Sequence, residues 1–145
     1  MNEFITLEIP AKAEYVVLGR LALAGLLRER GFSADAVADL KLALTEACSN
    51  SIRHAYNGHT NGGGQVLLSF EVFDDRLVMK IRDDGAGFHE DDIDCPQCAA
   101  VDGADHLAAG GMGISIIRAV VDEFELERPA EGGTTLVLTK LCDVR

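Results

Sequence analysis

The sequence predicts an α+β fold, a two-layer sandwich in which helices pack on one face of a mostly antiparallel mixed sheet. Segments with alternating apolar residues and segments with helical periodicity follow one another in the order strand, two helices, two strands, an irregular stretch, helix, two strands. The 145 residues, 48% of them hydrophobic, suffice for one domain with its own core. We therefore expect residues 1–145 to form a single domain.

The N-terminal elements are expected to be one strand and two helices. Residues 4–9 place apolar side chains at every second position, and Pro10 ends this strand. Residues 11–30 have helical periodicity, and a second helix is expected over residues 34–56, where Ser33 is a suitable N-cap. The core stripe of this second helix comprises Val37, Leu40, Leu44, Cys48 and Ser51.

A β-hairpin and a long irregular segment are expected next. Strands over residues 66–73 and 77–82 flank an Asp-Asp turn. Residues 84–111 lack periodicity, and an irregular stretch of this length within a domain is usually a lid or a binding loop. The last three elements are a helix and two strands, expected over residues 113–122, 124–127 and 134–141.

The charge of the chain excludes several classes of partner. Twenty-four acidic residues against 13 basic ones give a net charge of −11, which repels phosphate backbones and anionic lipids. Nucleic acid and membrane surfaces are therefore not expected partners. No apolar run approaches the ~20 residues that cross a membrane, and the first residues do not resemble a signal peptide, so we expect a cytoplasmic protein.

Three polar residues in the second helix form a stripe beside the core stripe. Glu46, Asn50 and His54 lie four residues apart, so each is only about 40° around the helix from the last. Such a stripe can be a solvated helix face. It can also face a ligand, with the amide of Asn50 holding a metal ion and Glu46 accepting a proton.

Two glycine-containing motifs follow. Asp83, Gly85 and Gly87 come directly after an expected strand, where a carboxylate can accept hydrogen bonds from an amine such as that of adenine. The alternative is a plain acidic turn. Residues 110–113 (GGMG) precede an expected helix, whose free amides suit a phosphate, although this motif can also be a hinge.

In their order along the chain, these motifs resemble those of the Bergerat-fold ATPases, the superfamily of gyrase, histidine kinases and MutL. The greatest similarity is to the bacterial anti-sigma factor serine-protein kinases. It is carried by residues 46–56 (EACSNSIRHAY), 111–114 (GMGI) and 133–135 (GTT), and it spans essentially the whole chain. The resemblance implies the Bergerat ATP-binding fold, with residues 84–111 as the nucleotide lid.

The resemblance also implies a role for each motif. Glu46 would be the catalytic base, Asn50 would hold magnesium, and Asp83 would bind the adenine amine. ATP and magnesium are thus the implied cofactors. The other implied nucleotide-binding positions are Gly85, Gly87, Gly111, Met112, Gly113 and Thr134 or Thr135.

The implied function is an ATP-dependent serine-protein kinase of a partner-switching pathway. Such a kinase sequesters a sigma factor, phosphorylates a STAS-domain anti-sigma factor antagonist on serine, and is commonly a homodimer. One alternative is a nucleotide-gated binding module without kinase activity, which the lack of Lys or Arg between Arg82 and Arg118 favours. Another is the detached catalytic domain of a histidine kinase, but no segment has room for its phosphoacceptor helices.

Four cysteines remain unassigned. Cys48 and Cys142 are expected to be free thiols. Cys95 and Cys98 form a CxxC motif in the expected lid, where they can be inert thiols, a redox pair or part of a metal site.

Overall fold

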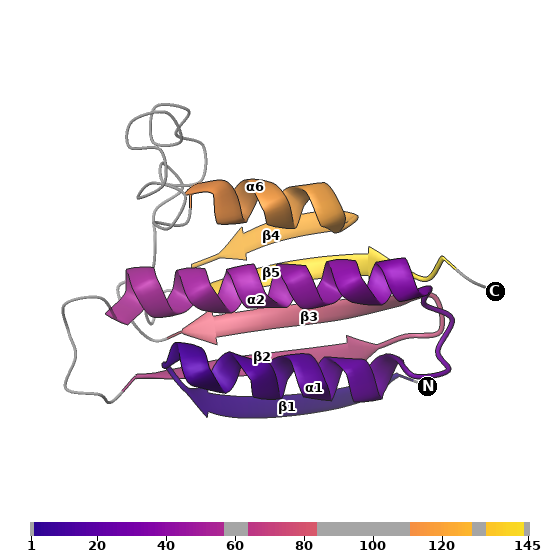
Figure 1. The fold of residues 1–145 in the computed structure, drawn as a ribbon, viewed down its shortest axis with the longest axis horizontal. Coiled ribbons are helices and arrows are strands. Elements are labelled where there is room, and N and C mark those ends of the chain that lie inside the picture. Colours follow the sequence, from indigo (N-terminus) through magenta and orange to yellow (C-terminus); the bar gives the residue numbers. More distant parts are fainter. Residues whose placement is uncertain (1, 57–63, 84–110, 129–132, 144–145) are drawn as a thin grey trace.

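Three helices cover one face of a five-stranded sheet in the part of the chain that the computed structural model describes, namely residues 2–56, 64–83, 111–128 and 133–143 (Figure 1). The strand order is β1-β2-β3-β5-β4, and each of the four strand pairings is antiparallel. The strands are β1 (Glu3–Pro10), β2 (Gln65–Val72), β3 (Arg76–Asp83), β4 (Glu123–Glu127) and β5 (Thr134–Leu141).

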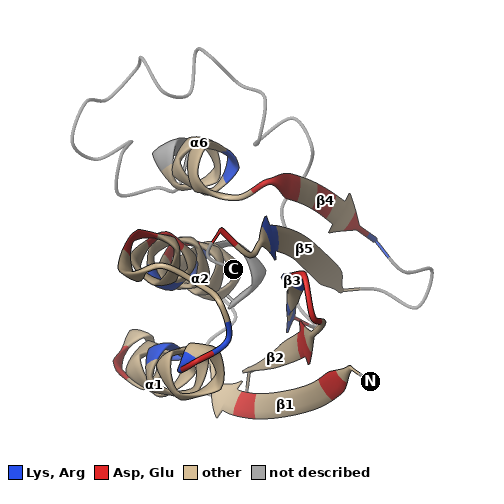
Figure 2. Ribbon diagram, turned by 90° about the vertical axis from the view of Figure 1, so that its right-hand side faces the viewer, with Lys and Arg blue, Asp and Glu red and all other residues tan. Residues whose placement is uncertain are grey.

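The helices form the second layer. Viewed end-on, α1, α2 and α6 lie side by side on the same side of the sheet (Figure 2). Their bounds are α1 (Val16–Leu27), α2 (Ala34–Tyr56) and α6 (Gly111–Val120), and a short 3-10 helix, η1 (Ala13–Tyr15), precedes α1. The expected α+β sandwich is therefore confirmed. No helix among the described residues is long and apolar enough to span a membrane.

The helix expected over residues 11–30 is shorter in the structure. The amide of Ala11 donates a hydrogen bond to the carbonyl of Gly64 at 2.9 Å, so pairing between β1 and β2 continues beyond Pro10 and delays the helix. At the other end, Arg28 is extended, and Gly31 adopts a φ of 82°. The expectation that the helix extends to residue 30 was wrong, because the chain leaves the helical conformation at Arg28, directly after Leu27, and Glu29 then adopts a φ of 64°.

The second helix is confirmed over the expected residues. Ser33 acts as its N-cap, with Oγ accepting a hydrogen bond from the amide of Ala36 at 3.0 Å. The same hydroxyl donates a short hydrogen bond to the carboxylate of Asp143, which ties the start of α2 to the end of β5.

The third helix is displaced by two residues from its expected span of 113–122. It begins at Gly111 and ends at Val120. The amide of Asp122 instead donates a hydrogen bond to the carbonyl of Thr139 at 2.9 Å, and the carboxylate of Asp122 accepts one from the amide of Leu141 at 2.7 Å. These bonds join the end of α6 to the sheet and explain why the helix stops early.

The core lies between the two layers. Alternate positions of β2 and β3 are buried against the helices, which explains the period-two pattern of both strands. Helix α1 approaches closely, because a Cβ at Gly19 would lie 2.8 Å from Cδ1 of Leu68. The largest fully buried side chains are Ile9, Leu23, Leu40, Leu44, Leu68, Phe70, Leu77, Met79, Ile81, Ile117, Leu136 and Leu138.

The two edges of the sheet differ. Edge strand β4 exposes glutamates at alternate positions, with Phe124 and Leu126 half-buried between them. Edge strand β1 instead exposes the aromatic ring of Phe4, which is 62% accessible.

Candidate functional site

Two motifs that lie more than 60 residues apart in sequence meet where α2 passes the start of α6. A Cβ atom at Gly113 would lie 2.9 Å from Oε2 of Glu46, 3.1 Å from Nδ2 of Asn50 and 3.3 Å from its Oδ1. The missing side chain of Gly113 thus lets the N-terminal turn of α6 approach the polar stripe of α2. The structure brings a carboxylate, an amide and a helix N-terminus together, as the sequence motifs require.

Asn50 carries the strongest sign of a ligand site. Its side chain is 1% exposed, and neither Nδ2 nor Oδ1 makes a hydrogen bond within the described part of the chain. A buried polar group without a partner costs about 1–3 kcal/mol, so native proteins rarely keep one without a purpose. The amide oxygen of Asn50 is therefore available to a ligand.

The residues present fit a magnesium ion. Magnesium prefers oxygen ligands and commonly takes only one or two from the protein, with substrate phosphates and waters supplying the rest. Asn50 offers one such oxygen, and the half-buried carboxylate of Glu46 lies on the same side of α2. A cage of three or more acidic, histidine or cysteine side chains does not occur among the described residues.

A second buried polar group lies at the end of β3. Asp83 is 1% exposed and pairs in register with Val66 on β2 and with Thr134 on β5. Like the buried Leu77, Met79 and Ile81, it occupies a position of β3 that faces the helices. Its carboxylate is therefore on the side of the sheet that the helices cover, and Figure 1 shows the end of β3 near the C-terminal half of α2.

The strand register separates the two threonines that the sequence left as alternatives. Thr134 is 2% exposed and shares its face of β5 with the core residues Leu136 and Leu138. Thr135 is 7% exposed but points to the opposite face, where it pairs with Arg82. Thr134 is thus the threonine on the same side of the sheet as Asp83.

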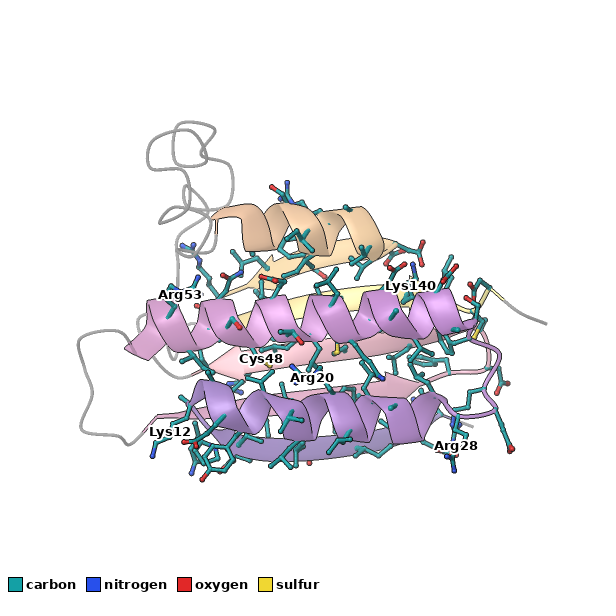
Figure 3. The ribbon with its side chains drawn as sticks, in the orientation of Figure 1. Lys12, Arg20, Arg28, Cys48, Arg53 and Lys140 are labelled. Atoms are coloured by element: carbon teal, nitrogen blue, oxygen red, sulfur yellow. The ribbon has the colours of Figure 1, made fainter. Side chains whose placement is uncertain are left out.

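Burial makes the thiol of Cys48 inert. Its side chain is 0% exposed, and desolvation raises the pKa of the thiol to about 12, although the nearby guanidinium of Arg20 acts in the opposite direction (Figure 3). Cys48 and Cys142 are free, as expected. Cys95 and Cys98 lie outside the described residues.

Other candidates are placed only in part. Gly85, Gly87 and most of the expected lid lie outside the described residues. Gly111 and Met112 form the first turn of α6, and His54 lies in the last turns of α2, but their side chains are not described.

Two further residues of α2 lie near Glu46 and Asn50 in sequence: Arg53, expected to be an exposed surface charge, and Ser51, expected in the core stripe. Arg53 is half-buried near the C-terminal end of α2 (Figure 3), so the expectation of a fully exposed charge was wrong. It lies seven positions after Glu46, a spacing that places both residues on one face of a helix. Ser51 is 1% exposed next to Asn50. The available signal for Ser51 was a hydroxyl in an otherwise apolar core stripe.

Comparisons with known proteins identify the family of the chain. The family model of the histidine kinase-like ATPase domain matches residues 9–140. The serine-protein kinase RsbW of Bacillus pumilus is 37% identical over 99% of this chain and 90% of its own length. The serine-protein kinase RsbW of Listeria monocytogenes is 35% identical over 97% of this chain and 88% of its own length.

Two solved structures have the same fold. The structure of the RsbU and RsbW domains of Rv1364c from Mycobacterium tuberculosis matches with a TM-score of 0.62 and 20% identity, over 96% of this chain and 32% of that one. The SiaB–SiaC complex of Pseudomonas aeruginosa matches with a TM-score of 0.58 and 17% identity, over 94% and 89%. From the family model and the curated relatives, the chain belongs to the RsbW family of anti-sigma factor serine-protein kinases.

Proposed function

We propose that this kinase transfers the γ-phosphoryl group of ATP to a serine of a STAS-domain anti-sigma factor antagonist, and that it sequesters a sigma factor in the same pathway. The meeting of Glu46, Asn50 and Gly113 at the start of α6 carries the proposal. Phosphoryl transfer depends on positioning and charge neutralisation more than on covalent chemistry. These three residues supply the positioning, and a magnesium ion held by Asn50 would supply the charge neutralisation.

Each residue then has one task. Asn50 would hold a magnesium ion through its amide oxygen, and the bound ion supplies charge neutralisation for the phosphates. The free amides in the first turn of α6, including those of Gly111 and Met112, bind phosphate oxygens. Glu46 orients the serine hydroxyl of the protein substrate and accepts its proton. Arg53 contributes positive charge that residues 83–117, which contain no Lys or Arg, do not supply.

The base of the nucleotide lies at the end of β3 in this proposal. The carboxylate of Asp83 accepts a hydrogen bond from the adenine amine, and Thr134 lines the same pocket. Gly85 and Gly87 let the nucleotide approach the backbone. The lid, expected over residues 84–111, is formed by residues 84–110 in this proposal, because Gly111 belongs to α6. One cytoplasmic ATP-binding domain then accounts for all 145 residues.

We propose a homodimer formed through the outer face of α1. This helix contains a single charged residue, Arg20, and exposes apolar side chains, among which Leu21 is 63% accessible. A helix that is apolar on all sides is usually buried, so this face needs a cover. Phe4 on edge strand β1 is also exposed, but it alternates with Ile5, Leu7 and Ile9 and so lies on the opposite face of the sheet from α1.

Phosphate transfer tests the proposal directly. The purified chain is incubated with magnesium-ATP and each STAS-domain protein of its own genome, and the products are weighed by intact mass. We expect one STAS protein to gain a single phosphate on serine, and Glu46→Ala to abolish this gain while ATP binding is kept. Phosphorylation that survives Glu46→Ala would contradict the assignment of the base.

A nucleotide-gated binding module is the second candidate. The absence of Lys and Arg from residues 83–117 favours it, because the lid then contributes no cation to the transition state. Stable, ATP-dependent binding of a STAS protein that never gains mass would establish this alternative.

A further inference from the structure

Ser51 carries a buried hydroxyl that the folded chain does not use. The residue lies in α2, three positions after Cys48 and seven after Leu44, both fully buried in the core, so its side chain faces the sheet. Its Oγ has no hydrogen-bond partner in the part of the chain that the structure describes. Since buried hydroxyls in native proteins are nearly always paired, this group calls for a partner from outside the chain.

Thr45 on the same helix shows what a structural hydroxyl does here. Its Oγ1 donates to the carbonyl of Lys41, four residues earlier, at 2.8 Å and accepts a hydrogen bond from Arg20 at 3.2 Å. The carbonyl four residues earlier is the usual partner of a serine or threonine within a helix. Ser51 does not make this bond, so its hydroxyl remains available on the side of the sheet.

The space that Ser51 faces changes from apolar to polar at this position. Earlier in α2, the stripe on the sheet consists of fully buried apolar side chains, including Leu40 and Leu44. Beyond it lies the end of the sheet, where Asp83 and Thr134 pair in register and are both buried on the side of the helices. Figure 1 shows the C-terminal half of α2 passing above this end of β3. Ser51 thus stands at the boundary between the core and the proposed base pocket.

We propose that Ser51 is a base-binding residue whose hydroxyl donates a hydrogen bond to ring nitrogen N1 of adenine, directly or through one water. This inference rests on the proposed ATP-binding function. Adenine presents a donor, its amine, beside an acceptor, N1. An ionised carboxylate such as Asp83 can only accept, so the pocket needs a separate donor for N1, which a hydroxyl provides.

The carboxylate of Asp83 selects against guanine, whereas the hydroxyl of Ser51 can donate or accept and so follows that choice. Guanine presents a carbonyl oxygen where adenine has its amine, and this oxygen would face the carboxylate of Asp83, acceptor against acceptor. A site built to hydrogen-bond one polar pattern rejects a base with the reverse pattern strongly, because its buried groups are then left unpaired.

Replacement of Ser51 by alanine should have two effects of opposite kind. The ligand-free protein should unfold at the same or a higher urea concentration, since the variant loses an unsatisfied buried hydroxyl. The dissociation constant for magnesium-ATP should rise about three- to tenfold, the value of one net hydrogen bond. Thr45→Val is the matched control: it removes a satisfied hydroxyl, so it should lower stability and leave ATP affinity within about twofold.

An ATP analogue with carbon in place of N1, 1-deaza-ATP, closes a double-mutant cycle with Ser51→Ala. Calorimetric titrations of both proteins with both nucleotides give the coupling between hydroxyl and N1. We expect Ser51→Ala to weaken ATP binding and leave 1-deaza-ATP binding unchanged. An equal loss with both nucleotides, or none with ATP, would overturn the inference and leave the kinase function standing. Failure of the unmodified chain to bind ATP would refute the proposed function itself, and the role of Ser51 with it.

Discussion

The contact between α6 and α2 can be tested by adding one methyl group at Gly113. The new Cβ would lie 2.9 Å from Oε2 of Glu46, whereas ordinary van der Waals contact begins at 3.4 Å, so the carboxylate must retreat by at least the difference, 0.5 Å. Because a misplacement of about 1 Å can lower an enzymatic rate about 100-fold, half of that displacement should lower it about tenfold. Asn50 must shift as well, since its Nδ2 would lie 3.1 Å away.

The same methyl group should have little effect on folding. Alanine is favoured over glycine within a helix by about 0.5–1 kcal/mol, which offsets part of the crowding at Gly113. We therefore expect the free energy of unfolding of Gly113→Ala to stay within about 1 kcal/mol of the parent value. Gly25→Ala in α1 is the matched control, because a Cβ there would meet nothing within 4 Å. It should stabilise the chain by about 0.5–1 kcal/mol and leave the reaction rate unchanged.

Single-turnover phosphorylation of the STAS substrate, followed by intact mass, gives the rate, and urea unfolding gives the stability. We expect the Gly113→Ala variant to be folded but to phosphorylate its substrate slowly. The Gly25→Ala variant should keep the parent rate and be slightly more stable. If Gly113→Ala phosphorylates its substrate at the parent rate, the position of Glu46 is not sensitive to the approach of α6, and the reasoning fails.

Three further predictions concern other parts of the molecule. Leu21→Glu should convert the proposed dimer into monomers in light scattering with ATP binding retained, whereas an unchanged mass would exclude α1 as the interface. Ser33→Ala should lower the free energy of unfolding by about 0.5–2 kcal/mol in urea, because α2 loses its N-cap. A smaller loss would mean that another group accepts the hydrogen bond from the amide of Ala36 in the variant. The pKa of Cys48 rises on folding from 9.0 to about 12, so the unfolded chain loses this proton first and stability should fall as pH rises above 9. This thiol lowers the free energy of unfolding by at most about 1.4 kcal/mol per pH unit. In urea titrations at pH 8–10, Cys48→Ala should therefore show a weaker decrease of stability with pH than the parent chain.

Local patterns predicted the elements whose ends are set locally. Helix α2 was found over its full length because its periodicity is long and Ser33 marks its start. The start of α1 was not predicted correctly, because it depends on the hydrogen bond between Ala11 and Gly64, two residues that are 53 positions apart. Helix boundaries that depend on such long-range pairing leave no signal in the neighbouring residues.

The same distinction holds for the site. Glu46 and Asn50 could be assigned to one face because a helix fixes their relation. The choice between Thr134 and Thr135 could not be made, since it needs the register of β5 against β3. Ser51 was classed with the core because periodicity reports which way a side chain points and not whether its hydroxyl finds a partner.

The two edges of the sheet differ in how far they are protected against pairing with a strand of another chain. An uncovered edge strand can recruit a strand from another chain, and charged side chains along the edge are a common protection against this. Strand β4 has three exposed glutamates within five residues, so two such edges would repel each other on approach. Strand β1 exposes two glutamates, Glu3 and Glu8, and also the aromatic ring of Phe4. The glutamates of β4 therefore oppose the pairing of two copies through this edge, which protects the sheet against open-ended growth on that side.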